Sequence, residues 1–381
     1  MRTLPIFLSF FVMGIADAMG PLADAVRGQY RLSNVVATFL TFFVFIAFAL
    51  FSVPGGLLAA RLGKKRLLLL ALALNAVAAA VPALLVPSFG LLLGCIFLLG
   101  IGTTFLQVAG NPIMRDVSAE GAYARNLTFA QFIKGAGSAG SSYLVGLAAA
   151  LPLLGAMGWR GVFPVFLVLM ALAFLAVSTL KLEEARPEAP PSVASSLGLL
   201  KEPVFALAVL GIFLYVGAEV CMARFLKPTL AGFGLPADRA ALLGPTLFFA
   251  SLTAGRLLGS GVLRFIGPRP FFGLSAALGL LATLALALNL KGFALAGVVA
   301  AGLGFANIWP LLFALTVEAR PGRSSELSGL MCMAISGGAL LPLLMGRLLD
   351  GGLAGLAYLV PAAAFGFLLL LALRGRAVRG A

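Results

Sequence analysis

Apolar runs of about 20 residues follow one another almost from end to end of this chain, separated only by short clusters of glycine, proline or arginine. A helix needs about 20 apolar residues to cross the hydrocarbon core of a bilayer. Charged residues make up 10% of the 381 residues, whereas soluble domains contain about 25%. The sequence therefore predicts an all-α polytopic membrane protein and excludes soluble enzymes, secreted disulfide scaffolds and nucleic-acid-binding proteins.

The apolar runs predict twelve transmembrane helices, because each gap between them contains a charge, a proline or a glycine pair. The predicted spans cover residues 4–26, 34–60, 66–86, 89–114, 123–150, 159–181, 203–231, 239–265, 268–289, 292–317, 325–349 and 353–373.

Lysine and arginine in the short loops indicate the orientation of the chain. Most of them fall on the side of the N-terminus, including Arg61, Lys64 and Lys65 after the second span. The excess of positive charge marks the cytoplasmic side, so we expect both termini in the cytoplasm and the protein in a bacterial inner membrane. The net charge of +14 therefore reflects topology, and no nucleic-acid partner is expected.

The chain divides at its longest polar stretch. This stretch holds three prolines and mixed charges, which predicts an N-terminal six-helix bundle at 1–181, a cytoplasmic linker at 182–202 and a C-terminal six-helix bundle at 203–381. An offset of 202 residues places Phe11 on Phe213 and Asp17 on Glu219. These matches indicate an internal repeat, with two bundles related by pseudo-twofold symmetry.

Residues for metal binding or covalent catalysis are scarce. The chain has no histidine, and its three cysteines, Cys95, Cys221 and Cys332, lie inside apolar runs without metal-ligand spacing. We expect no metal, no cofactor and no enzymatic activity. The glycines of 135–140 fit the dinucleotide fingerprint, but they fall in the middle of a predicted span, which favours helix packing.

Several motifs carry a resemblance to a known family. The loop at 56–65 matches the loop signature of the major facilitator superfamily, except that Ala60 occupies its acidic position. The segments 100–112, 125–131, 215–219, 307–315 and 328–342 resemble spans 4, 5, 7, 10 and 11 of the fucose, galactose and glucose proton symporter family. The resemblance implies the twelve-helix fold and proton-driven sugar import by alternating access.

The sequence departs from that family at its mechanistic positions. In the family's fucose carrier, an aspartate in span 1 and a glutamate in span 4 are associated with sugar and proton binding. Gly20 and Gln107 occupy these positions here, and a glutamine cannot titrate. Lys134 replaces a family asparagine, and Arg224 replaces a small residue.

Ionisable side chains inside the predicted spans are the first candidates for a transport site. Each costs about 2.5 kcal/mol or more at the bilayer centre, so it usually faces a cavity or a partner. Asp17 and Glu219 are predicted to bind substrate and the coupling proton, and Lys134 and Arg224 to recognise substrate or balance these acids. We expect Lys134 to pair with Asp17. Arg256 and Lys227 are interpreted as gate or snorkelling residues near span ends.

Amide and aromatic side chains complete the predicted substrate site. Amides both donate and accept hydrogen bonds, which suits a polyol. The predicted substrate-binding set also includes Gln107, Asn111, Gln131, Asn307 and Trp309.

These features predict a monomeric transporter of a small sugar or sugar-like polyol, with the substrate held between the two halves of the chain. Its other partners would be a coupling proton and the lipid bilayer. Two alternatives stay open. Lys134 and Arg224 also fit a carrier or exporter of organic or sugar-acid anions, and the protein would be an uncoupled facilitator if no proton moves with the substrate.

Overall fold

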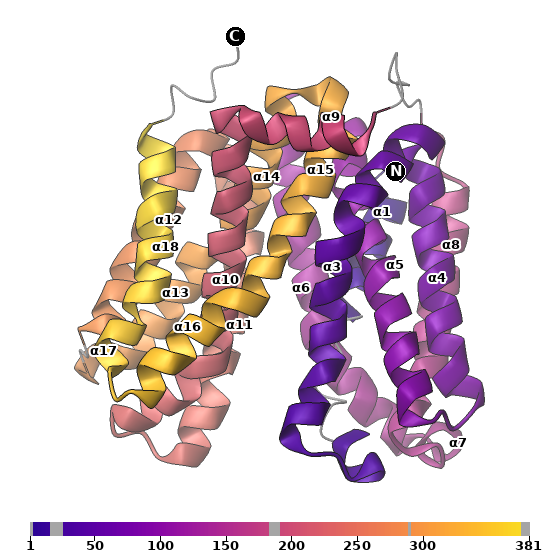
Figure 1. Cartoon of the computed structure of the whole chain (residues 1–381), viewed down its shortest axis with the longest axis horizontal. Coiled ribbons are helices and arrows are strands. Elements are labelled where there is room, and N and C mark those ends of the chain that lie inside the picture. Colours follow the sequence, from indigo (N-terminus) through magenta and orange to yellow (C-terminus); the bar gives the residue numbers. More distant parts are fainter. Residues whose placement is uncertain (1–2, 16–25, 183–190, 289–290, 375–381) are drawn as a thin grey trace. The chain divides into compact units, whose positions relative to one another are not determined.

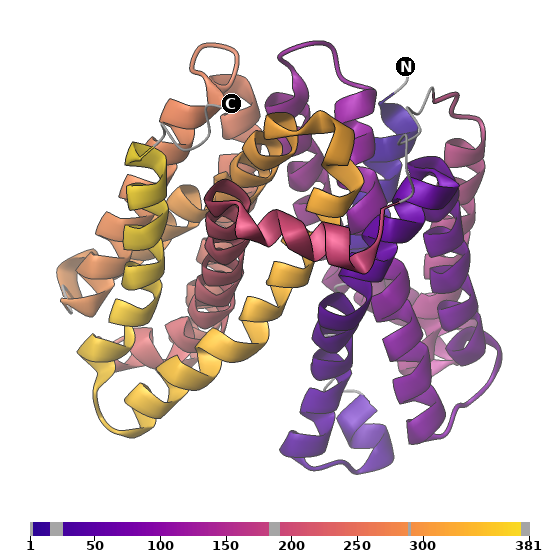
Figure 2. The ribbon, with the colours of Figure 1, turned by 45° about the horizontal axis from the view of Figure 1, so that its top comes forward.

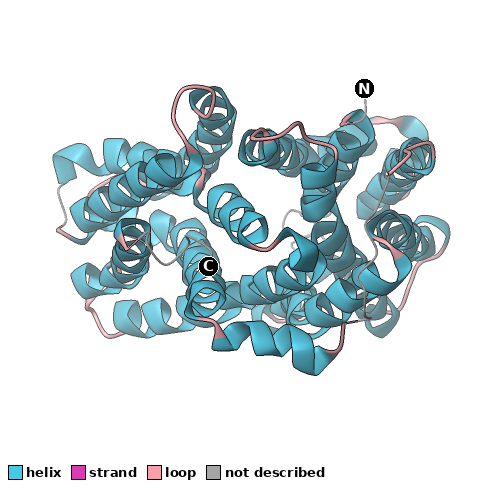
Figure 3. Cartoon of the chain, turned by 90° about the horizontal axis from the view of Figure 1, so that it is seen from above, coloured by secondary structure: helices cyan, strands magenta, loops and turns pink. Residues whose placement is uncertain are grey.

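The computed structural model describes residues 3–15, 26–182, 191–288 and 291–374. Every regular element in these ranges is a helix (Figure 3). Asp17 lies outside the described residues.

The helices of the first half begin and end within a few residues of the predicted runs, except that α1 is described only to Ile15 (Figure 1). Serine hydroxyls cap two of them, because Ser33 accepts from the backbone N–H of Val36 and Ser88 from that of Leu91. Gly63 separates two helices at a φ of 95°, a conformation that favours glycine. The elements are α1 (Leu4–Ile15), α3 (Asn34–Leu62), α4 (Lys64–Leu84), α5 (Phe89–Asp116), α6 (Tyr123–Ala150), α7 (Pro152–Gly155) and α8 (Val162–Ser178).

The second half follows the predicted runs as well, with two corrections. The runs at 292–317 and 325–349 are each divided into two helices, at Asn307 and at Ala334–Ser336. The polar linker also contains a short helix, α9. The elements are α9 (Val193–Gly198), α10 (Pro203–Gly232), α11 (Ala237–Val262), α12 (Pro268–Ala287), α13 (Ala294–Ala306), α14 (Ile308–Ala319), α15 (Ser324–Met333), α16 (Gly337–Asp350), α17 (Ala354–Ala357) and α18 (Leu359–Leu373).

Within the described ranges, nine helical segments are long and apolar enough to cross a membrane. The helices α1 and α18 are apolar but shorter, at 12 and 15 residues. The structure thus has the helices of an integral membrane protein, and the count of twelve crossings stays a prediction.

The chain forms two compact units. Unit 1 comprises Met1–Glu120, Ile133–Ser196 and Gly322–Met333, and unit 2 comprises Gly121–Phe132, Leu197–Pro321 and Ala334–Ala381. Each unit therefore contains segments from both sides of the linker. The predicted bundle boundaries at 181 and 203 stay a prediction.

Glycines allow one helix of each unit to pack closely between two neighbours. In unit 1, a Cβ on Gly100 would touch α3, and one on Gly102 would touch Asn75 of α4. In unit 2, a Cβ on Gly302 would touch α11, and one on Gly304 would touch α12. Glycines paired by the 202-residue offset thus make equivalent contacts, so the repeat in the sequence is also a repeat in packing.

A second pair of contacts repeats between the units, although its two glycines are 200 residues apart and so do not follow the 202-residue offset. In unit 1, Gly137 of α6 lies against the carbonyl oxygen of Phe11 on α1, and in unit 2 Gly337 of α16 lies against that of Phe213 on α10. A Cβ at either glycine would overlap the carbonyl. The glycine motif at 135–140 accordingly lies inside α6, without the strand that a dinucleotide site requires.

Backbone contact also joins α3 and α15 within unit 1. A Cβ on Gly56 would lie 2.7 Å from the carbonyl oxygen of Ser325, and one on Gly329 would lie 2.8 Å from that of Ser52. Two helices can approach this closely only where neither carries a side chain. The first residue of the matched loop signature, Gly56, therefore serves helix packing.

Candidate functional site

The predicted amides of unit 1 lie on one face of α5. Gln107 and Asn111 are one turn apart, and they are 5% and 0% exposed. Amides buried this deeply need hydrogen-bond partners, so they favour polar surroundings over lipid. This face of α5 is polar, although most residues of the helix are apolar.

A proline next to Asn111 explains a contact between α5 and α15. Pro112 has no backbone N–H, so the carbonyl oxygen of Val108 lacks its usual helical donor. The hydroxyl of Ser328 on α15 donates to this oxygen at 2.8 Å, and Ser328 is fully buried. A side chain from another helix thus replaces the hydrogen bond that the proline removes.

Cys332 lies one turn beyond Ser328 on α15. Its buried thiol is in hydrogen-bonding contact with Ser328 and Asn111, and the charge of Lys134 on α6 acts on it. Lys134 is half-buried. Side chains from α5, α6 and α15 therefore meet in unit 1 and form a cluster of Gln107, Asn111, Lys134, Ser328 and Cys332.

A second polar cluster lies in unit 2 and begins on α10. Tyr215 and Glu219 are one turn apart on this helix; Tyr215 is fully buried and Glu219 half-buried. The Tyr215 hydroxyl is in hydrogen-bonding contact with the side chains of Glu219 and Arg256. The charges that act on this hydroxyl belong to Glu219 and to Arg256 of α11.

Arg256 is 8% exposed and joins three segments of unit 2. Its Nε donates to the carbonyl oxygen of Ala306 at 3.2 Å, where α13 ends. Its Nη1 donates to the carbonyl oxygen of Gln131 on α6 at 3.4 Å. The snorkelling interpretation is therefore wrong for Arg256, because its charge is turned inward to main-chain oxygens.

Asn307 occupies the break between α13 and α14. Its Nδ2 donates to the carbonyl oxygen of Gly255 at 3.1 Å. The side chain is 3% exposed, and its Oδ1 has no hydrogen-bond partner among the described residues. An unpartnered buried acceptor costs about 1–3 kcal/mol, so it marks a place where a ligand hydroxyl would be favourable.

Aromatic rings lie on the helices that carry these polar groups. Trp309, two residues after the break, stacks on Phe313 with ring centroids 4.8 Å apart. The ring of Tyr215 contacts Phe305, with centroids 6.0 Å apart. Unit 2 thus combines buried hydrogen-bonding groups with flat apolar faces, which is typical of small-molecule sites.

The structure brings most of the predicted residues into one cluster or the other, but not all of them. Arg224 is exposed, and its guanidinium lies 6.0 Å from the ring centroid of its neighbour Phe225. No ion pair joins it to Glu219. The Lys134–Asp17 pair stays a prediction, because Asp17 is outside the described residues.

Four residues of these clusters are absent from the predicted site: Ser328, Cys332, Tyr215 and Arg256. The first three lie within the family-like segments but are neither charged nor amides. Arg256 was placed near a span end. The available signal was proline: Pro112 and Pro310 each free a carbonyl four residues earlier, and a freed carbonyl inside a membrane needs a donor from elsewhere.

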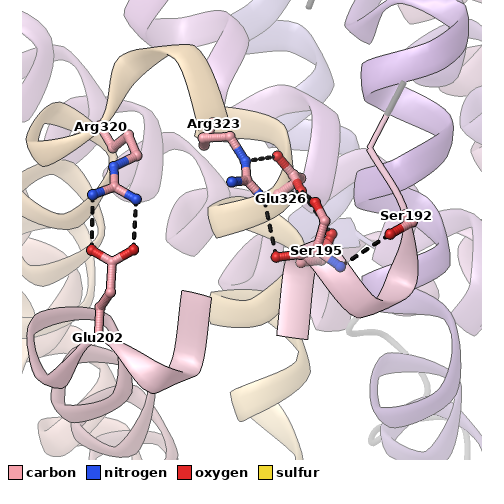
Figure 4. Close-up of polar contacts among 7 residues, drawn as sticks. Ser192, Ser195, Glu202, Arg320, Arg323 and Glu326 are labelled. Atoms are coloured by element: carbon pink, nitrogen blue, oxygen red, sulfur yellow. Dashed lines mark hydrogen bonds and ion pairs between the residues drawn. The ribbon is translucent and has the colours of Figure 1, made fainter. Parts of the chain in front are cut away.

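Charged groups also meet at the first turn of α15, where α9 lies beside it (Figure 2). Glu326 is 5% exposed and accepts hydrogen bonds from the hydroxyls of Ser195 and Ser196 at 3.1 and 2.9 Å. Arg323 donates to both carboxylate oxygens of Glu326 and to the carbonyl oxygen of Ser195 (Figure 4). Part of the linker is therefore fastened to unit 1.

Comparison with known proteins identifies the family. The model of the Major Facilitator Superfamily matches residues 6–342. The chain belongs to this superfamily. It is therefore a membrane transporter, as the loop signature and the family-like segments predicted, and not an enzyme. Within the described residues, no group of three or more cysteine, aspartate or glutamate side chains could hold a metal ion.

The chain is similar to named sugar carriers over nearly its whole length. A glucose/galactose transporter of Brucella abortus biovar 1 is 28% identical over 383 residues, which cover 97% of this chain and 92% of the relative. A putative glucose/galactose transporter of Helicobacter pylori is 28% identical over 397 residues, covering 96% and 94%. The solved structure of the E. coli fucose:proton symporter shares the fold, with a TM-score of 0.84, 21% identity and 97% coverage of both chains.

Proposed function

We propose that this protein carries a small sugar or sugar-like polyol across a bacterial inner membrane, with both termini in the cytoplasm and twelve transmembrane helices in two six-helix bundles. The substrate would cross the membrane by alternating access, and its import would be coupled to a proton. The observation that carries this proposal is the buried Oδ1 of Asn307 in unit 2, which has no hydrogen-bond partner among the described residues.

The chemistry of unit 2 suits a neutral polyol. A sugar hydroxyl can donate to Asn307 Oδ1 and would give this buried acceptor its missing partner. Trp309 offers an aromatic face, and Glu219 a carboxylate that accepts from hydroxyls. The names of the glucose/galactose relatives support a hexose as the substrate.

In unit 1, Gln107 and Asn111 would bind further hydroxyls, with Lys134 beside them. Asp17 would hold the coupling proton together with Glu219, because Gln107 cannot take up a proton. The structural likeness to the fucose:proton symporter supports the fold in which such coupling would operate.

A ligand screen tests the substrate class. Purified protein is heated with D-glucose, D-galactose, L-fucose, sugar acids or amino sugars, and a ligand that binds only the folded state raises the Tm. We expect a rise with at least one neutral hexose and none with glycine betaine, which is not a polyol, at the same osmolarity. A rise only with uronates would overturn the neutral-sugar proposal.

A second function, transport of organic or sugar-acid anions, is favoured by one specific observation: Arg256 places a cation inside unit 2, at 8% exposure. Competition separates the two functions. In proteoliposomes, uptake of labelled galactose should be inhibited by unlabelled neutral hexoses and not by galacturonate. The reverse pattern would support the anion carrier.

The coupling acids give a prediction of their own. In proteoliposomes, Asp17→Asn should abolish accumulation driven by a pH gradient while keeping counterflow, because a coupling carboxylate is needed only for the proton. Glu219→Gln should do the same if the two acids share the proton. Asp350→Asn, which changes an exposed carboxylate at the end of α16, serves as the control. Undiminished uphill uptake by Asp17→Asn would refute its role, and no pH-driven uptake by the parent would indicate a facilitator.

A further inference from the structure

Arg256 is a buried cation whose guanidinium donates hydrogen bonds to main-chain oxygens. A charge inside the hydrocarbon region is costly unless polar groups replace its water. Here Nε bonds to the Ala306 oxygen at 3.2 Å and Nη1 to the Gln131 oxygen at 3.4 Å. Because burying the charge of Arg256 is unfavourable, we expect its hydrogen bonds to have a structural or functional purpose.

Pro310 explains why the carbonyl oxygen of Ala306 needs a donor from another helix. In a continuous helix, the N–H of residue 310 would donate to the carbonyl oxygen of Ala306, and proline has no N–H. The span divides at Asn307, and the Ala306 oxygen at the end of α13 receives the guanidinium of Arg256 in place of the missing donor. The Ser328 hydroxyl fills the same role for the carbonyl that Pro112 frees on α5.

The contact between α11 and the break is reciprocal. While Arg256 donates to Ala306, its neighbour Gly255 accepts from Asn307 Nδ2 at 3.1 Å. One turn on, Gly259 leaves the room that the Asn307 amide occupies, since a Cβ there would overlap it. Two hydrogen bonds and one steric fit thus fix Ala306 and Asn307 against one face of α11.

We propose that Arg256 is a positioning residue for the substrate side chains of the divided span, Asn307 and Trp309. By holding the Ala306 carbonyl, it sets the direction in which α14 leaves the break, and so the places of Asn307 Oδ1 and of the Trp309 ring. Its bond to Gln131 ties α6 to the same point. This inference rests on the proposed function insofar as Asn307 and Trp309 bind the sugar.

The test uses Arg256→Met, which keeps an unbranched side chain of similar character to the arginine stem and removes the donors. In counterflow, the half-saturation concentration for D-galactose should rise about tenfold, the effect of about one misplaced hydrogen bond, while the maximal rate changes less than twofold. Because Trp159 and Trp309 are the two tryptophans of the chain, a Trp159→Phe background leaves Trp309 as a reporter. Its emission maximum should shift without any sugar present.

Pro310→Ala provides the decisive rescue. Alanine at 310 restores the N–H that can donate to Ala306, so Pro310→Ala combined with Arg256→Met should recover most of the lost affinity, the Trp309 emission and the Tm. Arg264→Met, which changes an exposed arginine beyond the end of α11, should change none of these. Arg256→Lys keeps a charged donor group but loses the two-sided geometry of the guanidinium. It should show the same pattern more weakly, and it replaces Arg256→Met if that variant does not fold.

The outcomes separate this inference from the proposed function. If the double variant loses the sum of the two single effects, as independent sites do, Arg256 does not act through the break and the inference is overturned. An unchanged Trp309 emission in Arg256→Met also overturns it. If the parent binds no hexose, the proposed function fails, whereas the emission and Tm measurements still decide whether Arg256 positions α14.

Discussion

Gly137→Val is expected to lower the free energy of unfolding by about 3 kcal/mol or more, because its Cβ would overlap the carbonyl oxygen of Phe11 and force α1 away from α6. A main-chain oxygen cannot move aside as a flexible side chain can. Reversible unfolding in detergent, followed by helix content, measures the loss. Transport should fall with it.

The same helix supplies the control. A Cβ on Gly140 has nothing within 4 Å, so Gly140→Val carries the same cost of helix propensity without the overlap. Gly337→Val should reproduce the large effect in unit 2, where its Cβ would overlap the carbonyl of Phe213. Equal stability of Gly137→Val and Gly140→Val would show that the close approach of α1 and α6 does not exist.

The second large effect is expected from Arg323→Ala, which should lower stability by about 3 kcal/mol. The Glu326 side chain is 4% exposed, and removing its cation leaves a buried charge whose remaining partners among the described residues are two serine hydroxyls. The double variant Arg323→Ala with Glu326→Ala should recover part of the loss, because it removes the charge as well. Unfolding of the three variants in detergent gives the coupling between the two residues.

An exposed ion pair on the same linker provides the comparison (Figure 4). Arg320 Nη1 lies 2.6 Å from Glu202 Oε1, but each side chain is 43% exposed. Solvent screens such a pair, so Arg320→Ala should cost at most about 1 kcal/mol. If Arg323→Ala and Arg320→Ala lower the free energy of unfolding equally, the burial of Glu326 does not determine how much its ion pair stabilises the protein.

Much of the fold could be predicted because insertion into a bilayer depends on local hydropathy. The runs at 34–60 and 89–114 became α3 and α5 within about two residues at each end. The divided spans were missed, although Pro310 and the glycine pair Gly337 and Gly338 were visible. The apolar run continues through a helix break. Hydropathy therefore does not reveal a break that side chains of neighbouring helices stabilise.

The candidate site was predictable in its residue types and not in its partners. Gln107, Asn111 and Asn307 were predicted because an amide can both donate to and accept from the hydroxyls of a polyol. Nothing in the sequence separated Arg256 from a snorkelling arginine, because both lie several residues from a span end. Arg224 resembled a site residue in sequence and is exposed in the structure.

The sequence by itself determined that this is an all-helical membrane protein, where most helices begin and end, and to which superfamily it belongs. These properties follow from local composition and short motifs. The tertiary structure alone decided which polar groups meet. Ser328 reaches Val108 across 220 residues and Arg256 reaches Gln131 across 125. Such contacts depend on how each helix is rotated and tilted against its neighbours, and packing sets that geometry while hydropathy leaves it open.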